Sequence, residues 1–560
     1  LNSANTVAVF QIEREGFQAL LRKMDMKRFE EIIALVALNR PGVVRSGMTD
    51  EYLKREKDPS QVKYPDSSLE DILKDTYGVV LYQEQVMQVA RELAGFSPAQ
   101  ADDMRKAMSK KIPEVLEKLR KQFVEGAVKN NIKKKKADDI FSMLAKFASY
   151  GFNKSHSAAY GLIVYRTAYL KANYPAEYMA AALTCDMGNT DKIAKYVQEA
   201  QRMGIEVKPP SVETSKIEFE VPAGGVIEYG LEAVKNVGSS AIESILDARR
   251  RDGSFKSFYD FCTRVDMKKV NKRVIESLIK AGAFDFLGQG RKPLFNVTEV
   301  AMAQAASEQE DKQKGQKTFF ESFDDGETPE VNIEDKSRWK ENELLAMEKE
   351  ALGYYFSGHP LAKHENDINN ITSGTIKNIR QGIAPGSSVV AGGMVKHTRK
   401  LKTRKGDQMA VFTLEDLTGT LPAVLFPSSY TEETAARITE DKMVIVTGKL
   451  DDRKGNKQII ANSIIPLEEA RSKLVGKVKL KLGSSGISGE DIKGIKKIIA
   501  KYPGTVPVGF EVNTDRFQKI NITTDTKVRI NDSLLKELYR EIGQENVELL
   551  GKIKLKENAA

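Results

Sequence analysis

The spacing of apolar residues changes along this chain, and the change limits the chain to a protein of several domains. Residues 1–200 are dense in the three- and four-residue spacing of amphipathic helices, whereas residues 373–466 alternate apolar and polar side chains every second position. One period suits helices and the other suits strands, so the two regions require different architectures. At about 150 residues per domain, the length of 560 residues corresponds to about four domains. We therefore expect a multidomain α+β protein.

The first 290 residues are predicted to be mainly helical. The apolar run 29–38 ends at Asn39-Arg40-Pro41-Gly42, where proline and glycine stop a helix. Further helices are expected within 78–95, 97–111 and 157–184. A strand-like VIEYGL within residues 205–290 precedes further short helices, and residues 301–336 are polar and charged, which predicts a flexible segment.

The C-terminal part is predicted to contain two small domains. Five short strands separated by Gly, Asp and Asn within residues 373–466 are typical of a five-stranded, oligonucleotide-binding type of barrel. Residues 471–560 alternate strands such as KVKLKL with helices such as EDIKGIKKIIAKY. This alternation predicts a small terminal α/β module.

Composition restricts the class of protein. The formal net charge is +9 and the isoelectric point is near 9.0, which fits a polyanionic partner but also fits solvated lysine faces. The two cysteines, Cys185 and Cys262, lie far apart in no metal-like spacing, which indicates a reducing, cytoplasmic setting without a zinc site. We find neither an apolar run of about 18 residues nor a signal peptide, so no membrane location is expected.

Several cations in the first 160 residues are candidates for binding phosphate. They are Arg40 in NRPG, Arg105, Lys110 and Lys111 in MRKAMSKK, and Lys154 in YGFNKSHSAAYG, where Asn153 and His156 flank it. Phosphate-rich ligands require converging cations, because positioning and charge neutralisation provide most of their stabilisation. The alternative is that these are solvated helix faces, and the run KKKK at 133–136 fits that alternative or a DNA-backbone patch better. His156 lacks a companion at metal-ligand spacing, so we expect it to donate a hydrogen bond to a phosphate or a carbonyl.

The acidic residues show no pattern typical of the metal-binding part of a phosphoryl-transfer site. Two-metal catalysis needs converging carboxylates, commonly an Asp-x-Asp pair on a strand, and the sequence contains no such pair. The adjacent pairs Asp324–Asp325 and Asp451–Asp452 fall in expected loops. The chain is therefore predicted to hold phosphates without carrying the metal site.

Two later segments are candidates for binding DNA. The turn at Lys235, Val237 and Gly238 opens a helix, whose backbone N–H groups can hold a phosphate without reading sequence, although an ordinary helical packing unit explains it equally well. The first hairpin of the expected barrel carries VKHTRKLKTRKG, predicted to be a mobile basic arm that includes Lys396, Arg399, Lys402 and Arg404. Aromatic residues for base stacking are sparse there: Phe412, Phe426 and Tyr430.

With these segments assembled, the chain resembles the bacterial replicative DNA polymerase III alpha subunits, which are C-family DNA polymerases. The resemblance rests on AVFQIEREG (8–16), IIALVALNRPG (32–42), YGVVLYQEQVMQVARELAGFS (77–97), MRKAMSKK (104–111), FASYGFNKSHSAAYGLIVYRTAYLKANYPAEYMAA (147–181), YGLEAVKNVG (229–238), LIKAGAFDFLG (278–288) and LGYYFSGHPL (352–361). It implies the remainder of the palm and the fingers at 1–200, a clamp-binding domain with tandem helix-hairpin-helix units at 201–300, a flexible linker with a clamp-binding peptide at 301–336, a connecting segment at 337–372, an OB-fold at 373–466 and a tau-binding-like domain at 471–560.

The resemblance also implies roles for residues. The cations at Arg40, Arg105, Lys110, Lys111 and Lys154 would meet the triphosphate of an incoming dNTP. A peptide of the form Gln-x-Ser/Asp-Leu/Met-Phe would bind the beta sliding clamp, and QKTFF offers Gln316, Thr318, Phe319 and Phe320, of which Thr318 and Phe319 depart from the preferred types. Alternatively, the two phenylalanines pack onto their own domain.

The same resemblance implies partners and a missing part. Primer-template DNA, the clamp-loader tau subunit and a proofreading exonuclease subunit are the expected partners. The family's PHP domain and its palm aspartates, which hold Mg²⁺, have no counterpart in this sequence, so this chain alone is predicted to be inactive and part of a longer or split protein. Two hypotheses remain: the C-terminal portion of a DNA polymerase, or a non-catalytic protein that binds DNA and the clamp.

Overall fold

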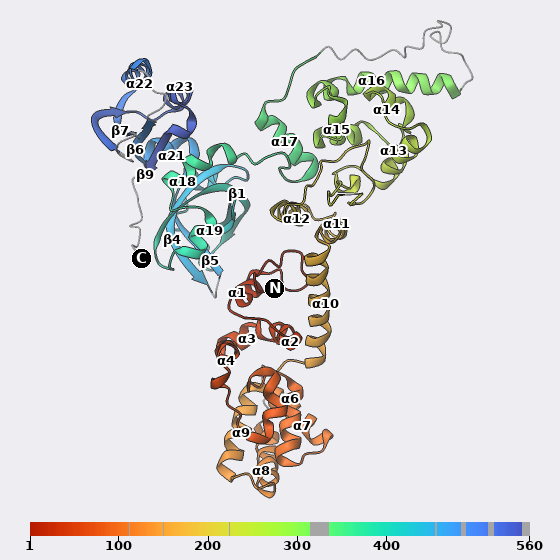
Figure 1. The fold of residues 1–560 in the computed structure, drawn as a ribbon, viewed down its shortest axis with the longest axis vertical. Helices are drawn as coiled ribbons and strands as arrows, with labels where there is room; N and C mark the ends of the chain where they lie inside the picture. Colours follow the sequence, from red (N-terminus) through yellow and green to blue (C-terminus); the bar gives the residue numbers. More distant parts are fainter. Residues whose placement is uncertain are drawn as a thin grey trace. The chain divides into compact units, whose positions relative to one another are not determined.

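The computed structural model describes residues 1–110, 113–148, 150–222, 224–313, 335–453, 456–482, 489–512 and 520–551 (Figure 1). The chain forms two compact units, Leu1–Phe356 and Ser357–Ala560. In the described residues of the first unit the regular elements are helices, joined by loops with isolated β-bridges, whereas the second unit contains a barrel and a four-stranded sheet. This confirms the expected multidomain α+β class.

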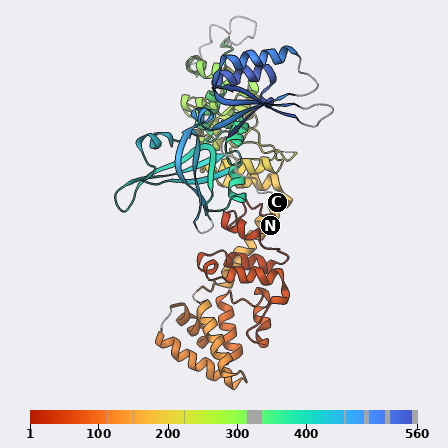
Figure 2. The same ribbon diagram turned by 90° about the vertical axis from the view of Figure 1, so that its left-hand side faces the viewer.

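The N-terminal half of the first unit is a series of helices, seen in red to orange in Figure 2. They are α1 (Glu15–Leu21), α2 (Phe29–Leu38), α3 (Pro41–Arg45), α4 (Met48–Lys57), α5 (Glu70–Leu73), α6 (Gln83–Ala94), α7 (Pro98–Lys110), α8 (Pro113–Lys129), α9 (Lys134–Ala148) and α10 (Lys154–Asn173). The apolar stripes of α6 to α9 meet in one core around Leu93, Phe123 and Leu144. At the crossing of α6 and α8, Gly126 lies against the Ala94 carbonyl, where a larger residue has no space.

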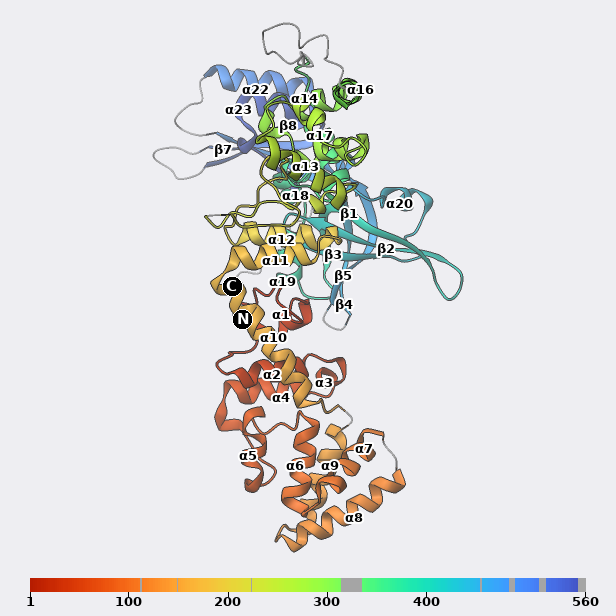
Figure 3. The ribbon, with the colours of Figure 1, turned by 90° about the vertical axis from the view of Figure 1, so that its right-hand side faces the viewer.

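Helix α10 lies along α2 and continues towards α11 (Pro175–Cys185), as Figure 3 shows. The contact with α2 is close, because Gly161 of α10 faces the backbone of Ile33. Pro175 begins α11, so the apolar stretch 157–184 forms two helices and not one. The expected helix 78–95 is also shorter than predicted: residues 79–82 are extended, Tyr82 pairs with Phe152 in a β-bridge, and α6 begins only at Gln83.

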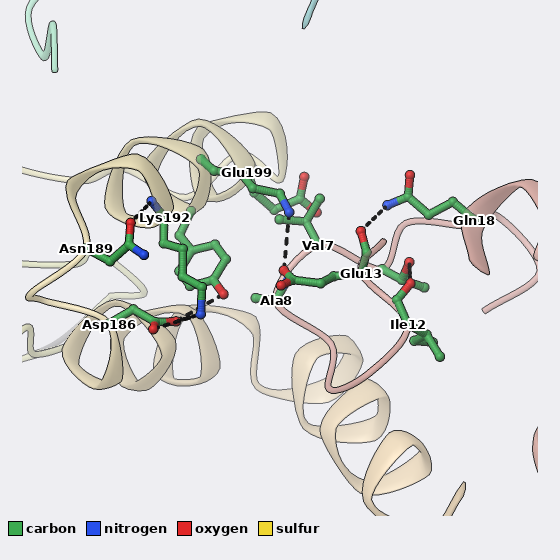
Figure 4. Close-up of polar contacts among 12 residues, drawn as sticks. Val7, Ala8, Ile12, Glu13, Gln18, Asp186, Asn189, Lys192 and Glu199 are labelled. Carbon is green, nitrogen blue, oxygen red and sulfur yellow. Dashed lines mark hydrogen bonds and ion pairs between the residues drawn. The ribbon is translucent and has the colours of Figure 1, made fainter. Parts of the chain in front are cut away.

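The first segment of the chain, residues 4–13, is held in an unusual conformation at the end of α10. Ala4, Ala8 and Gln11 have φ values of 55°, 62° and 63°, which non-glycine residues rarely adopt. The buried Lys171 amine donates to the carbonyl of Val7 (2.8 Å) and contacts the Glu199 carboxylate (2.6 Å). Figure 4 shows Val7, Ala8 and Glu13 of this segment close to Glu199 and its neighbours on α12 (Thr190–Arg202).

The rest of the first unit packs around a second large core. Its helices are α13 (Ser239–Asp252), α14 (Phe258–Arg264), α15 (Lys272–Ala281), α16 (Arg291–Gln313) and α17 (Glu341–Leu352). The predicted strand at VIEYGL contributes only bridges, Val207 to Ile227 and Glu220 to Glu228.

Helix α16 corrects the expectation that residues 301–336 are flexible throughout, because residues 301–313 are helical. The buried face of α16 is formed by small residues, and Ala301 and Ala305 are fully buried. Gln309 donates through Nε2 to the carbonyls of Thr263 and Val265, which end α14. Alanines and a glutamine are weak apolar signals, so the sequence pattern did not reveal this packing.

The second unit begins with α18 (Glu365–Ile371) and α19 (Ile376–Gly382), followed by the barrel. Its strands, β1 (Ser388–Lys402), β2 (Gln408–Asp416), β3 (Gly419–Leu425), β4 (Met443–Arg453) and β5 (Asn456–Pro466), close in the order β1-β2-β3-β5-β4, with α20 (Glu432–Arg437) between β3 and β4. The predicted five-stranded barrel is confirmed, but its sheet starts at Ser388 and not near 373. Ile376 and Ile379, one helical turn apart, are instead buried against the barrel by α19.

The remaining segment forms the small α/β module that the sequence predicts. After α21 (Leu467–Leu474), strands β6 (Val475–Leu482), β7 (Pro503–Val512), β8 (Ile520–Val528) and β9 (Val547–Gly551) form a sheet in the order β8-β7-β6-β9. Helices α22 (Gly489–Lys501) and α23 (Asp532–Ile542) pack against each other beside this sheet (Figure 3). The short strand β9 was not expected.

Candidate nucleotide and nucleic-acid interfaces

The turn 150–156 is fixed to the start of α6 by backbone pairing. The Phe152 N–H donates to the Leu81 carbonyl (3.1 Å), and the Gln83 N–H donates to the Phe152 carbonyl (2.9 Å). The carboxylate of Glu84 then accepts from the Lys154 N–H (2.8 Å) and from Asn153 Nδ2 (2.9 Å). Two segments about 70 residues apart in the sequence therefore form one polar corner.

Asn153 begins α10 in this corner. Its side-chain oxygen accepts from the His156 N–H (2.7 Å), which satisfies one of the free N–H groups of the first helical turn. The exposed His156 ring lies between the rings of Phe152 (5.3 Å) and Tyr160 (4.1 Å). Asn153 is thus a helix cap, and His156 packs against aromatic rings.

Arg40 reaches the same turn from the start of α3. Its guanidinium donates to the carbonyls of Ala37 (3.1 Å) and Tyr150 and lies over the Phe152 ring at 4.4 Å. Burial lowers the pKa of this guanidinium from its usual value, although arginine remains charged. Gly42, two residues later, faces the Tyr150 ring so closely that a Cβ would lie 2.8 Å from it.

Lys154 is the most open cation of the corner. Its side chain is 42% exposed, and its amine lies 3.8 Å from Asp75 and 5.6 Å from the centre of the Tyr82 ring. Burial raises the pKa of Tyr82, and the nearby charges of Asp75 and Glu84 raise it further, so its hydroxyl stays neutral. Tyr82 therefore adds no negative charge beside Lys154, and the carboxylate near its amine is that of Asp75 at 3.8 Å.

Arg105 joins the corner indirectly. Its guanidinium binds Asp102 (2.8 Å) and reaches Gln83 Oε1 (3.4 Å), and Gln83 in turn donates to the Gly151 carbonyl (3.3 Å). Lys110, at the end of α7, is exposed and lines a surface groove between α7 and α8 together with Lys106 and Lys118. Lys111 lies outside the described residues.

The structure thus brings five of the seven predicted residues to one place: Arg40, Arg105, Asn153, Lys154 and His156. Sequence reasoning missed the groups that hold them there, namely Asp75, Tyr82, Gln83 and Glu84. The signal was available in VVLYQE, where a short β-like run precedes polar residues. A continuous helix was predicted there instead.

In the second half of the first unit, the predicted turn lies at the start of α13. Gly238 is the helix N-cap, is exposed and has open space around its Cα, so the first N–H groups of α13 can be approached from solvent. Val237 is buried and anchors the turn in the core. The Lys235 backbone N–H donates to the Ala351 carbonyl (2.9 Å), while its residue is exposed beside the turn.

In the barrel, the basic residues lie on the first hairpin, as the sequence predicts. Strands β1 and β2 continue as a paired hairpin, with Arg399 opposite Val411 and Lys402 opposite Gln408. Arg399, Lys402 and Arg404 are exposed, whereas Lys396 binds Glu415 (3.1 Å). The predicted hairpin is therefore confirmed, and its backbone pairing continues as far as Lys402 and Gln408.

Of the three aromatic residues expected in the barrel, Phe426 and Tyr430 are half-buried and only Phe412 is fully buried. Phe412 is buried in the barrel core, and Tyr430 packs against that core. Gln316, Thr318, Phe319 and Phe320, the predicted clamp-binding peptide, lie outside the described residues.

Comparison with known proteins agrees with this arrangement. The bacterial DNA polymerase III alpha subunit finger domain matches residues 1–131, a helix-hairpin-helix motif matches residues 204–294, and an OB-fold nucleic acid binding domain matches residues 389–467. The chain is 39% identical over 559 residues to DNA polymerase III subunit alpha of Vibrio cholerae, and 37% identical over 559 residues to that of Escherichia coli K12. The chain belongs to the bacterial DNA polymerase III alpha subunits.

Each of these two matches covers 98% of this chain but only 48% of the relative, so the chain spans about half the length of the curated relatives, corresponding to the C-terminal half of a DNA polymerase III alpha subunit. Among solved structures, an asparaginyl-tRNA synthetase from Pyrococcus horikoshii covers 15% of this chain and 20% of its own, with 22% identity and a TM-score of 0.13, a similarity too small to carry an inference.

The family implies Mg²⁺ for the complete DNA polymerase III alpha subunit, but the residues described here do not fit it. In the described ranges no group of three or more His, Cys, Asp or Glu side chains converges as a metal site would require. Across the same ranges, no helix combines the length and apolar character needed to cross a membrane.

Proposed function

We propose that this chain supplies the nucleotide-gripping and DNA-binding half of a DNA polymerase III alpha subunit, in which template-directed nucleotidyl transfer uses metal-binding aspartates from the other half. The polar corner at the start of α10 carries this proposal. It holds a half-exposed lysine and a half-buried arginine in a fixed arrangement at the start of a helix. Converging cations stabilise phosphate groups.

The neighbours of each cation suggest an order of importance. Lys154 has only a distant partner in Asp75, so its charge is open to the triphosphate of an incoming dNTP. Arg105 is already paired with Asp102 and would have to exchange that partner for a phosphate. Arg40 holds the turn through the Tyr150 carbonyl and the Phe152 ring. Lys154 is therefore the leading triphosphate contact, with Arg40 and Arg105 in support. Asn153 and His156 shape the corner. Lys110 and Lys111 extend the positive charge beyond it.

DNA would be held by two further surfaces. The open N-terminus of α13, with Lys235, Val237 and Gly238, suits a backbone phosphate because N–H groups there need no base contact. The exposed hairpin residues Arg399, Lys402 and Arg404 would follow the backbone of a strand electrostatically, and Lys396, paired with Glu415, would contribute less. With Phe412 buried, we expect this binding to depend on charge and to weaken strongly with salt.

The remaining partners follow from the family. Gln316, Thr318, Phe319 and Phe320 would tether the subunit to the beta sliding clamp, and the C-terminal module would contact the clamp-loader tau subunit. A proofreading exonuclease subunit is a further partner, and the complete assembly would act in the cytoplasm.

The second candidate function is a non-catalytic protein that binds DNA and the clamp. The lack of a metal-binding cluster among the described residues favours it. The polar corner favours the polymerase, because a tether has no use for a triphosphate site.

A reconstituted primer-extension assay separates the two functions. The 560-residue chain is mixed with the N-terminal part of the Vibrio cholerae subunit that its match leaves uncovered, and dNTP incorporation is measured with Mg²⁺. Lys154→Glu should raise the KM for dNTP by about tenfold or more, since a charged hydrogen bond contributes about 1.5–3 kcal/mol. Lys135→Glu, on the exposed face of α9, is the matched control and should leave KM unchanged. Synthesis that never appears while DNA binding persists would rule out the polymerase function.

A further inference from the structure

The hairpin of β1 and β2 continues past the barrel as a two-stranded ribbon, which can be followed in Figure 3. Within the described residues, the pairing of β1 with β4 ends at Met394, and the pairing of β2 with β3 begins at Ala410. The pairing of β1 with β2 continues to Lys402 and Gln408. We name residues 399–409 the hairpin tip.

The base of the hairpin tip is bent and anchored. The register of β1 against β2 shifts between Lys396 and Arg399, and His397 has a φ of 50°. A bulge of this kind bends a strand and changes the direction of the residues beyond it. Within the bulge, Thr398 donates through Oγ1 to the Ile438 carbonyl (2.7 Å). The barrel therefore fixes the direction in which the tip extends.

The two faces of the hairpin tip differ in chemistry. Leu401 lies opposite Met409 in the ladder, and Val411 shares their face because side chains alternate along a strand. Leu401 is 44% exposed, whereas Met409 and Val411 are half-buried. Lys400 and Lys402 lie on the other face. Leu401 is therefore an exposed aliphatic side chain that Met409 supports from the neighbouring strand.

The charge around Leu401 indicates a nucleic acid as the occupant. Residues 398–411 contain one acid, Asp407, and five cations. The cations, all of them exposed, are Arg399, Lys400, Lys402, Arg404 and Lys405. The core of a protein interface is depleted in charged residues, whereas a phosphate backbone requires this density of positive charge.

An aliphatic side chain among these cations has a use that charge alone does not explain. A phosphate contact needs a cation, so Leu401 adds nothing to the electrostatic binding of a strand. Residues 398–411 contain no Phe, Tyr or Trp, so the tip offers no flat ring on which a base could stack. Leucine and methionine side chains do insert between adjacent bases and unstack them, while neighbouring cations hold the phosphates.

We propose that the hairpin tip is a strand-separating wedge, in which Leu401, supported by Met409, inserts where the paired bases of a DNA duplex end. Arg399 and Lys402 hold phosphates beside the inserted side chain, and these contacts offset the free energy of unstacking. The proposal rests on the DNA binding of the proposed function and adds an action on DNA structure, the opening of the last base pair of a duplex.

The test is the fluorescence of 2-aminopurine at the junction of a forked duplex, because this adenine analogue becomes brighter when it unstacks. Saturation with the 560-residue chain should raise the fluorescence severalfold. Leu401→Ala should abolish most of the rise but change the affinity for the fork by less than about threefold, because the cations remain. Leu401→Met should retain the rise, since methionine also inserts between bases.

Two further variants complete the test. Leu417→Ala is the matched control and should behave as the wild-type chain, because Leu417 is 41% exposed on the turn between β2 and β3, outside the hairpin tip. Lys402→Glu should weaken binding to the fork and reduce its salt dependence, whereas Leu401→Ala should leave the salt dependence unchanged. Thermal unfolding establishes that each variant is folded.

Two fluorescence results would overturn the wedge: no rise when the wild-type chain is bound to the fork, or an equal rise with Leu401→Ala. An equal loss of affinity for single-stranded DNA and for the fork in Leu401→Ala would overturn it as well, because a wedge acts only where paired bases end. A dimer of the wild-type chain that Leu401→Ala dissociates would assign Leu401 to a protein interface instead. Binding without a rise refutes the wedge alone, whereas failure to bind either DNA refutes the DNA binding of the proposed function too.

Discussion

Replacing Lys171 by methionine tests whether one buried ion pair holds the strained N-terminal segment. Methionine keeps the length and apolar stem of lysine but donates no hydrogen bond. The change removes the contact with Glu199 (2.6 Å) and the bonds to the carbonyls of Val7 (2.8 Å) and Asn5 (3.3 Å). Glu199 keeps two bonds from Arg202, of 2.8 and 2.9 Å, so its charge is not left alone.

The expected cost follows from these partners. Removing one member of a buried ion pair costs about 3–5 kcal/mol, and the remaining Arg202 bonds place this case near the lower end, at about 3 kcal/mol. A change of 1.4 kcal/mol is tenfold, so amide exchange in residues 4–13 should become about a hundredfold faster. Hydrogen exchange with mass spectrometry measures this on the N-terminal peptides.

Lys195→Met is the matched control, because Lys195 lies on α12, is 45% exposed and contacts Glu13 of the same segment at 3.2 Å. An exposed pair contributes about 1 kcal/mol or less, so exchange should rise less than about fivefold. Equal acceleration by Lys171→Met and Lys195→Met would refute the idea that the buried pair holds the segment.

Three further predictions concern pH, capping and packing. Burial raises the pKa of Glu199, but hydrogen bonds from Arg202 and Lys171 outweigh this effect and leave the pKa below its usual value of 4.5. The stability that ionised Glu199 contributes is therefore present above about pH 4.5 and is lost as the pH falls further. Amide exchange in residues 4–13, corrected for its intrinsic rate, should accelerate over that fall in pH. Asn153→Ala removes the cap of α10 and should cost about 1 kcal/mol, seen as faster exchange at residues 154–157, whereas an unchanged rate would contradict the capping role. Gly126→Ala places a methyl group against the Ala94 carbonyl and should lower stability by about 1–3 kcal/mol in thermal unfolding. Gly188→Ala, where an added Cβ meets no atom within 4 Å and φ is not positive, is the control for that glycine and should change stability by less than about 0.5 kcal/mol.

Local sequence patterns predicted most helices and strands but not the contacts between them. The apolar spacing of residues 29–38 and the proline that follows predicted α2 and its end, and the alternation within residues 373–466 predicted the barrel strands. The prediction was wrong at 79–82, where the chain is extended because Tyr82 pairs with Phe152, some 70 residues away. It was also wrong at 301–313, where burial of alanines stabilises a helix that lacks an obvious apolar stripe. Both errors arise from tertiary contacts that override local preference.

The candidate site shows the same division. Residue type was sufficient to select Arg40, Arg105 and Lys154 as cations suited to phosphate, because charge is a property of the side chain alone. It could not rank them, since the rank depends on which acids lie near: Asp102 neutralises Arg105, whereas Asp75 stays 3.8 Å from Lys154.

The sequence by itself therefore determined the class of this protein, its succession of helical and β domains and the identity of its candidate phosphate-binding residues, because periodicity and charge are local properties. Only the tertiary structure decided that Glu84 and Asn153 form one corner, that Tyr82 pairs with Phe152, and that Leu162, Tyr165 and Tyr169 of α10 are exposed. Those features depend on contacts between residues far apart in the chain, and the free energy of such contacts exists only once the chain has folded.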